Sequence, residues 1–269
     1  MNLKRCLLPA AAAALLGSAL YLCWLPDVRP LKKNNPKETS YMLIKEAQAA
    51  AQGRKLPRNF IWKPWDGISD NLKYAVMISE DHMFYRHKGV NWEMTWEAAK
   101  ADLKKGRLAK GGSTITQQLA RNLYLSPSKN PLRKIKEYLI ARRLEKELGK
   151  RRIFEIYLNV AEWGKGIYVA QAASLAYFGH GADALTPEEA AALAAVLPSP
   201  RRYDPLKDSR FMRRRKSTIV ARMRASGYLP EETEDADLDA SLEGESLSSA
   251  PVAQLLPAPA TGQAAAPTE

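Results

Sequence analysis

Glu80-Asp81-His82-Met83-Phe84-Tyr85-Arg86-His87-Lys88-Gly89 is the stretch from which the fold and chemistry of this chain are best interpreted. It holds two carboxylates, two histidines, two aromatic rings and two cations. An apolar run over residues 74–78 precedes it, so we expect Glu80 to lie at the edge of the core. Partial burial raises the pKa of a carboxyl group toward the range useful for a general acid or base. The alternative is a helix-end glutamate that pairs with Arg86 or a histidine.

A second polar cluster, Gly111-Gly112-Ser113-Thr114-Ile115-Thr116-Gln117-Gln118, predicts a glycine-rich turn that leads into a helix. Thr114 and Gln117 fit a capping box, and a turn of this kind presents backbone N–H groups to an anion. Gln118 and Asn122 lie one helical turn apart, where two amides suit sugar hydroxyls. The cluster lacks the lysine of a P-loop.

The third cluster is Arg133-Lys134-Ile135-Lys136-Glu137. On a helix, Arg133 and Lys134 can both approach Glu137. Two interpretations are open. The groups form surface ion pairs worth about 0.3–0.5 kcal/mol each. Otherwise the cations hold phosphate oxygens, and the carboxylate orients them or a bridging metal.

Cysteine chemistry is excluded from the body of the chain, because Cys6 and Cys23 both lie in the apolar N-terminal segment. The body therefore has no internal disulfide and no cysteine metal site. His82 and His87 without cysteine partners are weak evidence for a metal. We expect a structural role, with an imidazole bonded to backbone or to Asp81.

The charge of the chain is uneven. It has 269 residues with 41 Lys and Arg against 29 Asp and Glu, and residues 231–269 hold nine of the acids and no Lys or Arg. Residues 1–230 thus carry 41 basic against 20 acidic side chains, a formal charge of +21. This charge favours an anionic partner: nucleic acid, a phosphate-bearing substrate or an anionic membrane surface. The alternative is solubility alone.

The N-terminal segment predicts a transmembrane signal anchor over residues 6–25, which contain no charged side chain. Twenty apolar residues in a helix can span the hydrocarbon core. Lys4 and Arg5 precede them, which favours a cytoplasmic N-terminus at residues 1–5. A cleaved signal peptide is the rival, but the run is long for one and lacks a small-x-small site.

The rest of the chain divides by composition. Residues 26–40 predict a polar linker, residues 41–230 a folded body, and residues 231–269 a disordered acidic, Ala- and Pro-rich tail. The body is mainly α, with few alternating strand patterns. Helices are expected at 38–51, 92–105, 135–144, 153–160, 167–178, 186–196 and 211–224, and capping signals stand at Gly179 and Thr186.

The three clusters are followed by a fourth motif, Lys-Arg-Arg-Ile-Phe-Glu-Ile-Tyr-Leu-Asn at 150–159. The four motifs in this order resemble the family 51 glycosyltransferases, the peptidoglycan glycosyltransferases. The resemblance covers roughly residues 55–205. It implies a mainly α, lysozyme-like domain with a small membrane-proximal lobe, here preceded by one transmembrane helix. Residues 126–129 match Ser-x-x-Lys, but no Ser-Asp-Asn or Lys-Thr-Gly follows. The chain therefore resembles the monofunctional biosynthetic members, without a transpeptidase domain.

The resemblance also implies the reaction and its place. Lipid II is polymerised into β-1,4 glycan strands with inversion at the donor anomeric carbon, and undecaprenyl pyrophosphate is released. The expected setting is the bacterial cytoplasmic (inner) membrane, with a single pass and a periplasmic catalytic domain. The expected partners are lipid II, the growing glycan strand and the membrane. Other cell-wall or division proteins are open, and no nucleic acid or organic cofactor is expected. Mg²⁺ or another divalent cation is left open.

Residue roles follow from the same resemblance. Glu80 matches the catalytic base. Glu137 matches the second glutamate, which stabilises the departing pyrophosphate directly or as a metal ligand. Cations are expected to neutralise the developing charge, at Arg121, Arg133 and Lys134. Donor-site contacts are expected at Ser113, Thr114, Gln118 and Asn122. Glu155 is expected to be structural.

Two rival interpretations are open, and the second comes from another class of protein. A lytic transglycosylase or lysozyme-like enzyme shares the fold and an essential glutamate, but cleavage of a neutral glycosidic bond needs no phosphate clamp. A membrane-anchored scaffold or nucleic-acid-binding protein would use the basic face and would not need Glu80.

Overall fold

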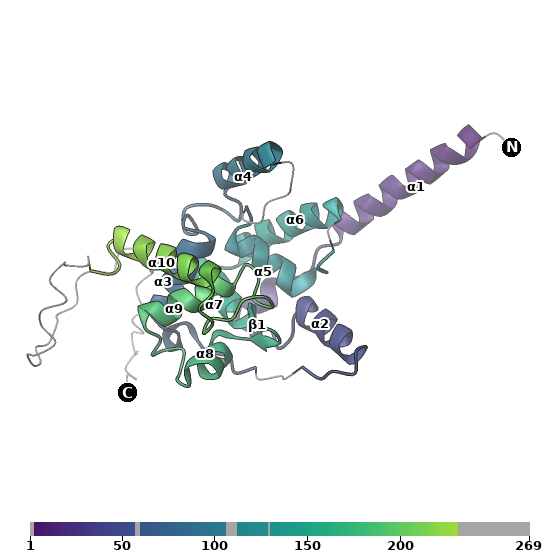
Figure 1. The fold of residues 1–269 in the computed structure, drawn as a ribbon. Helices are drawn as coiled ribbons and strands as arrows, with labels where there is room; N and C mark the ends of the chain where they lie inside the picture. Colours follow the sequence, from purple (N-terminus) through teal and green to yellow (C-terminus); the bar gives the residue numbers. More distant parts are fainter. Residues whose placement is uncertain (1–2, 57–59, 106–111, 129, 231–269) are drawn as a thin grey trace, which may run out of the picture. The chain divides into compact units, whose positions relative to one another are not determined.

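The computed structural model describes residues 3–56, 60–105, 112–128 and 130–230 (Figure 1). The disordered tail predicted for residues 231–269 lies outside these residues. The helices (α), 3₁₀ helices (η) and strands (β) are α1 Leu3–Cys23, η1 Arg29–Lys32, α2 Ser40–Ala50, η2 Trp65–Gly67, α3 Asp70–Glu80, α4 Trp92–Lys105, α5 Ile115–Tyr124, α6 Pro131–Glu147, α7 Lys150–Val160, β1 Glu162–Gly164, β2 Ile167–Tyr168, α8 Ala170–Phe178, α9 Pro187–Val196 and α10 Arg210–Ala225. The prediction of a mainly α fold is confirmed.

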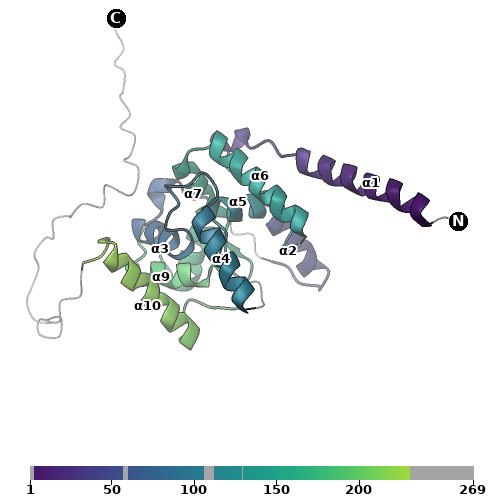
Figure 2. The same ribbon diagram turned by 90° about the horizontal axis from the view of Figure 1, so that it is seen from above.

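The chain divides into a large unit, Met1–Arg222, and a second unit that begins at Met223. In the large unit α3 packs against α9, and α5 packs against both α6 and α7 (Figures 1 and 2). Residues 72–78 of α3 and 190–196 of α9 are buried on all sides, as expected for helices inside a core. The core therefore holds α3 firmly up to its last turn, where Glu80 lies.

Local signals set several helix ends. Thr114 and Gln117 form a complete capping box at the start of α5. Thr186 and Glu189 form another at α9. Gly179 ends α8 in the left-handed region, with φ of 80°. These three sequence predictions are confirmed, because each rests on bonds between residues that are close in the chain.

The helix predicted for residues 167–178 begins too early. Residues 167–168 instead form β2, which pairs with β1 in an antiparallel hairpin. Val169 then has φ of 70°, an unfavourable value for a β-branched residue, and α8 starts only at Ala170. Strands of two and three residues are too short for alternation to reveal them, so the pattern alone favoured a helix.

Residues 26–40, expected to be a linker, contain η1 and are packed. Val28 is fully buried and Leu31 is 8% exposed. The guanidinium of Arg152 on α7 donates to the carbonyl oxygens of Leu31 and Asn34. These bonds fasten the segment to α7.

In the described part of the chain, no helix combines the length and the apolarity that a membrane crossing requires. The transmembrane anchor over residues 6–25 is therefore not confirmed and stays a prediction, as does the membrane-proximal lobe.

Candidate functional site

Glu80 is the last residue of α3, and its side chain is only 10% exposed. Its Oε2 accepts a hydrogen bond of 2.9 Å from Nε2 of Gln118. Its Oε1 lies 3.3 Å from Nη2 of Arg215 and 3.3 Å from Oγ of Ser79. Burial raises the pKa of Glu80 above its usual range, while the Gln118 bond and the charge of Arg215 oppose that rise. Glu80 is a helix-end glutamate, but it contacts Gln118, Ser79 and Arg215 and not Arg86 or a histidine as expected.

The amide of Gln118 is held in one orientation. The Tyr157 hydroxyl donates to its Oε1 at 3.0 Å, so the Nε2 group faces Glu80. Burial raises the pKa of Tyr157 well above its usual value, so this hydroxyl keeps its proton. Nε2 of Gln118 also lies 3.4 Å from the carbonyl oxygen of Ser113. Gln118 thus connects Glu80 to the turn before α5.

Glu137 is fully buried on α6 and lies between two cations. Nη1 of Arg133 donates to its Oε2 at 2.6 Å, and Nζ of Lys134 donates to its Oε1 at 2.5 Å. Lys134 also donates to Oγ of Ser113 at 2.8 Å. Because the carboxylate is buried, these are not the plain surface ion pairs of the first interpretation. Two cations around one carboxylate leave a local excess of positive charge.

These bonds join the two glutamates. From Glu80 the contacts run through Gln118, Ser113 and Lys134 to Glu137, with heavy-atom distances between 2.5 and 3.4 Å. Residues from α3, from the turn before α5 and from α6 therefore form one site. The sequence placed them in three separate clusters.

The scaffold under the site ties the first cluster to the second. Oδ2 of Asp81 accepts from the backbone N–H of Ile115, the first residue of α5, and from Nε2 of His87 at 2.9 Å. The Thr114 hydroxyl donates to the carbonyl oxygen of Gly89 at 2.7 Å. The predicted structural pairing of a histidine with Asp81 is confirmed. A carboxylate at the start of α5 also suits the helix dipole.

The remaining predicted residues differ in their surroundings. Thr114 is fully buried, and its hydroxyl serves the cap and Gly89, so the geometry does not support a substrate contact by this side chain. Arg121 and Asn122 are half-buried in the last turn of α5, one turn beyond Gln118. The charge of Arg121 contributes to lowering the pKa of Glu80. Glu155 pairs with Arg152 at 2.8 Å, in keeping with a structural role.

Sequence reasoning missed two contributors, Arg215 and Tyr157. Arg215 lies three residues after Met212 and four before Ile219, both buried in α10. That spacing puts it on the inward face of the helix, a signal that was present in the sequence. Tyr157 matched the apolar face of α7 and gave no sign that its hydroxyl would contact Gln118.

The described residues give no support for a protein-held metal at this site. Both oxygens of Glu137 already pair with cations. Within the residues that the structure describes, no three His, Cys, Asp or Glu side chains gather as a metal would need. A divalent cation stays a prediction.

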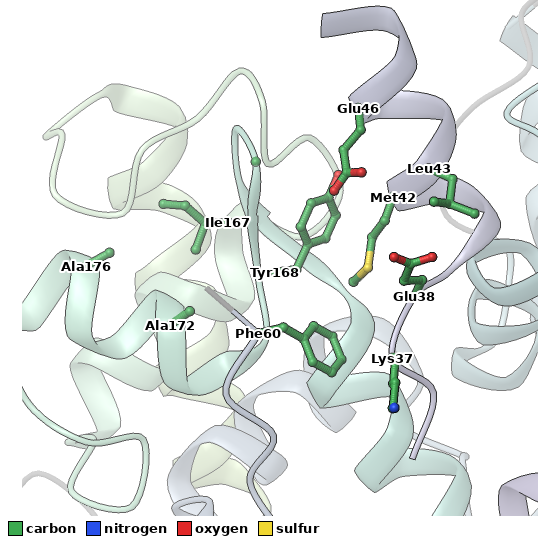
Figure 3. Close-up of a pocket in the computed structure, with 11 residues that line it drawn as sticks. Lys37, Glu38, Met42, Leu43, Glu46, Phe60, Ile167, Tyr168, Ala172 and Ala176 are labelled. Atoms are coloured by element: carbon green, nitrogen blue, oxygen red, sulfur yellow. The ribbon is translucent and has the colours of Figure 1, made fainter. Parts of the chain in front are cut away.

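A separate cavity lies between α2, β2 and α8 (Figure 3). Its walls are largely apolar, and Met42, Phe60 and Tyr168 point into it. None of the residues that line it belongs to the site around Glu80 and Glu137, which we call the two-glutamate site. The site is thus defined by its bonded side chains and not by this cavity.

The site thus combines a buried carboxylate of raised pKa, Glu80, with a second carboxylate, Glu137, that lies between two cations. This combination is typical of enzymes that use a general base together with an anion-binding group. Residues 47–224 match the transglycosylase family. The chain belongs to that family, and the match covers every site residue described above.

Three similar proteins share the same description. A biosynthetic peptidoglycan transglycosylase of Chromobacterium violaceum is 42% identical over 229 residues, which cover 85% of this chain and 100% of that protein. A protein of the same description from a Janthinobacterium species is 44% identical over 193 residues, which cover 72% of this chain and 84% of that protein. Another from Alcanivorax borkumensis is 43% identical over 224 residues, which cover 83% of this chain and 89% of that protein.

Proposed function

We propose that this protein is a peptidoglycan glycosyltransferase of cell-wall synthesis, which polymerises lipid II into β-1,4 glycan strands and releases undecaprenyl pyrophosphate. The bonded connection between Glu80 and Glu137 carries the proposal, because polymerisation needs a base and an anion clamp around one reacting carbon. The descriptions of the relatives support it and do not favour a glycan-cleaving enzyme. The family model that matches, over residues 47–224, is that of the transglycosylase.

Glu80 is the base. It takes the proton from the 4-hydroxyl of the acceptor sugar while that oxygen forms a bond to C1 of the donor. The bond from C1 to the phosphate oxygen breaks, and its electron pair leaves with the pyrophosphate. Attack from the face opposite the leaving group inverts the anomeric centre. The raised pKa strengthens Glu80 as a base, while Gln118 and Arg215 favour its ionised form.

The second carboxylate orients the clamp. Glu137 fixes Arg133 and Lys134 on one side of the site before substrate arrives. The Lys134 side chain is 47% exposed, so its ammonium group can also receive a pyrophosphate oxygen. Positive charge placed in advance stabilises the charge that develops on the leaving group. Ser113, Gln118, Arg121 and Asn122 complete the donor side.

The cellular setting is part of the proposal. A substrate carried on a polyprenyl lipid requires an enzyme at the membrane surface. The uncharged run at residues 6–25 and the basic body support an N-terminal anchor with the catalytic unit outside the cytoplasmic membrane. On α1 the side chains of Leu15, Leu16 and Leu20 are more than 60% exposed, as a lipid-facing helix would require.

Replacement of the base tests the mechanism. Glu80→Gln removes the base with little change of shape, so polymerisation of purified lipid II should fall at least about 100-fold while lipid II binding persists. Glu137→Gln should also be severe. Glu188→Gln makes the same change on the exposed start of α9 and should leave the rate unchanged. A Glu80→Gln enzyme with the wild-type rate would exclude this role.

A further inference from the structure

A second cavity, apart from the two-glutamate site, is lined by cations and aromatic rings. It has a volume of about 340 Å³, and we call it the basic cavity. Its cations are Arg86 and Lys88 from the segment after α3, and Arg142 from α6. Its rings are Trp92 at the start of α4 and Tyr138, one turn before Arg142. The volume is in the range of small-molecule sites, roughly 300–1,000 Å³.

The charges of the basic cavity favour an anion. Arg86, Lys88 and Arg142 are all exposed, and no Asp or Glu is among the residues that line the cavity. Asp81 and Glu145 lie in the same region but already bond to His87 and Lys150, respectively. Three cations that converge without a carboxylate recognise phosphate well, since guanidinium groups can bind its oxygens in pairs.

His87 does not add a further donor. Its Nε2 bonds to Asp81, and its Nδ1 accepts from the backbone N–H of Gly89 at 3.1 Å. Both ring nitrogens are thus engaged. The anion would therefore be held by the two arginines and the lysine.

The aromatic residues indicate the source of the phosphate. Trp92 is 66% exposed, and Trp96, one turn along α4, is 65% exposed. The Trp92 ring packs on the ring of Tyr138 with centroids 5.9 Å apart. Exposed indoles beside a cationic pocket are typical of a membrane interface, where the ring enters the head-group layer.

We propose that the basic cavity binds the phosphate of an anionic phospholipid head group, with Trp92 and Trp96 in the adjoining lipid surface. The site is independent of the glycosyl transfer chemistry. It would hold the segment that follows Glu80 and Asp81 at the depth of the lipid phosphates.

Native mass spectrometry of the full chain in a neutral detergent tests this assignment. The probes are phosphatidylglycerol, phosphatidylcholine and soluble sn-glycerol 1-phosphate. The wild type should retain phosphatidylglycerol in preference to phosphatidylcholine. A Lys88→Ala, Arg142→Ala variant should bind it roughly 25-fold more weakly, about fivefold for each cation removed. Lys207→Ala with Arg210→Ala removes the same charge at exposed positions outside the cavity and should bind as the wild type does.

Each other outcome overturns the proposal. Equal loss in both double variants would mean unspecific charge attraction, and no loss in either would exclude the cavity.

The indole is tested separately. Trp92→Ala should weaken lipid binding while glycerol phosphate binding is unaffected. If glycerol phosphate binds as tightly as the lipid, the site serves a soluble ester. Far-UV circular dichroism of every variant establishes that it is folded.

Discussion

Glu80 and Asp81 are adjacent carboxylates with different tasks. Glu80 is still helical, so its side chain stays on the face of α3 that meets Gln118. Asp81 has left the helix, with φ of −163° and ψ of 73°, and its side chain turns to the start of α5. The proposed base, Glu80, and the residue that anchors the start of α5, Asp81, are thus neighbours in the chain.

The charge of Arg215 should set the pH dependence of the reaction. It lowers the pKa of Glu80, which burial raises. Arg215→Met removes this effect, so the pKa should rise further and the base should be protonated up to a higher pH. The acidic limb of kcat against pH should therefore move to higher pH, with the rate recovering once Glu80 is ionised.

Arg214→Met is the matched control, because its side chain is exposed on the same helix. It should leave the acidic limb in place, measured as lipid II turnover across the pH range. A limb that stays fixed in Arg215→Met would show that this guanidinium does not act on the base.

At this scale the sequence predicted residues whose partners are close in the chain. Arg133, Lys134 and Glu137 meet within one helical turn, so their pairing was predictable. Arg215 meets Glu80 across 135 residues, and no local pattern encodes that distance. Tyr157 was equally hidden, since its hydroxyl contact depends on how α5 and α7 pack.

At the scale of elements, two helices begin with the same capping box in different surroundings. Thr114 is fully buried, and its hydroxyl also bonds to Gly89. Thr186 is exposed at the start of α9. The same motif therefore supports the site at α5 and only local helix structure at α9.

Removal of each cap should separate these contributions. Thr114→Ala should lower the free energy of unfolding by about 2 kcal/mol or more, because the cap is lost and a buried carbonyl loses its donor. Thr186→Ala should cost about 1 kcal/mol. The measurement is the urea midpoint of each variant in one detergent. Equal losses would mean that the bond to Gly89 contributes nothing.

Element boundaries were predictable where chain neighbours decide them. Capping chemistry located the starts of α5 and α9 and the end of α8. The β1–β2 hairpin was not predictable, because Ile167 and Tyr168 fit a helix as well as a strand and only pairing with β1 decides between them.

At the scale of the whole molecule, the site lies within the large unit and the proposed anchor lies at its N-terminal end. Lys136 of α6 lies over the ring of Tyr21 in α1, 3.9 Å from its centroid. The helix that carries Glu137 is therefore in contact with the segment proposed to enter the membrane. An anchor would keep the clamp near the source of its lipid substrate.

The orientation of the chain can be measured directly. With both native cysteines replaced by serine, Ser209→Cys should react with a membrane-impermeant maleimide in spheroplasts, because this exposed position belongs to the catalytic unit. Asn2→Cys should react only after lysis. The chain should remain in the pellet after alkaline carbonate. Release into the supernatant, or labelling of both positions in intact spheroplasts, would reject the single-pass arrangement.

The bond from Tyr157 to Gln118 has a consequence for titration. Because this phenol stays neutral, the amide beside Glu80 should not reorient as acidity changes. The proton on Glu80 should then govern the acidic side of the rate profile, and the logarithmic slope of that side should approach one, not two.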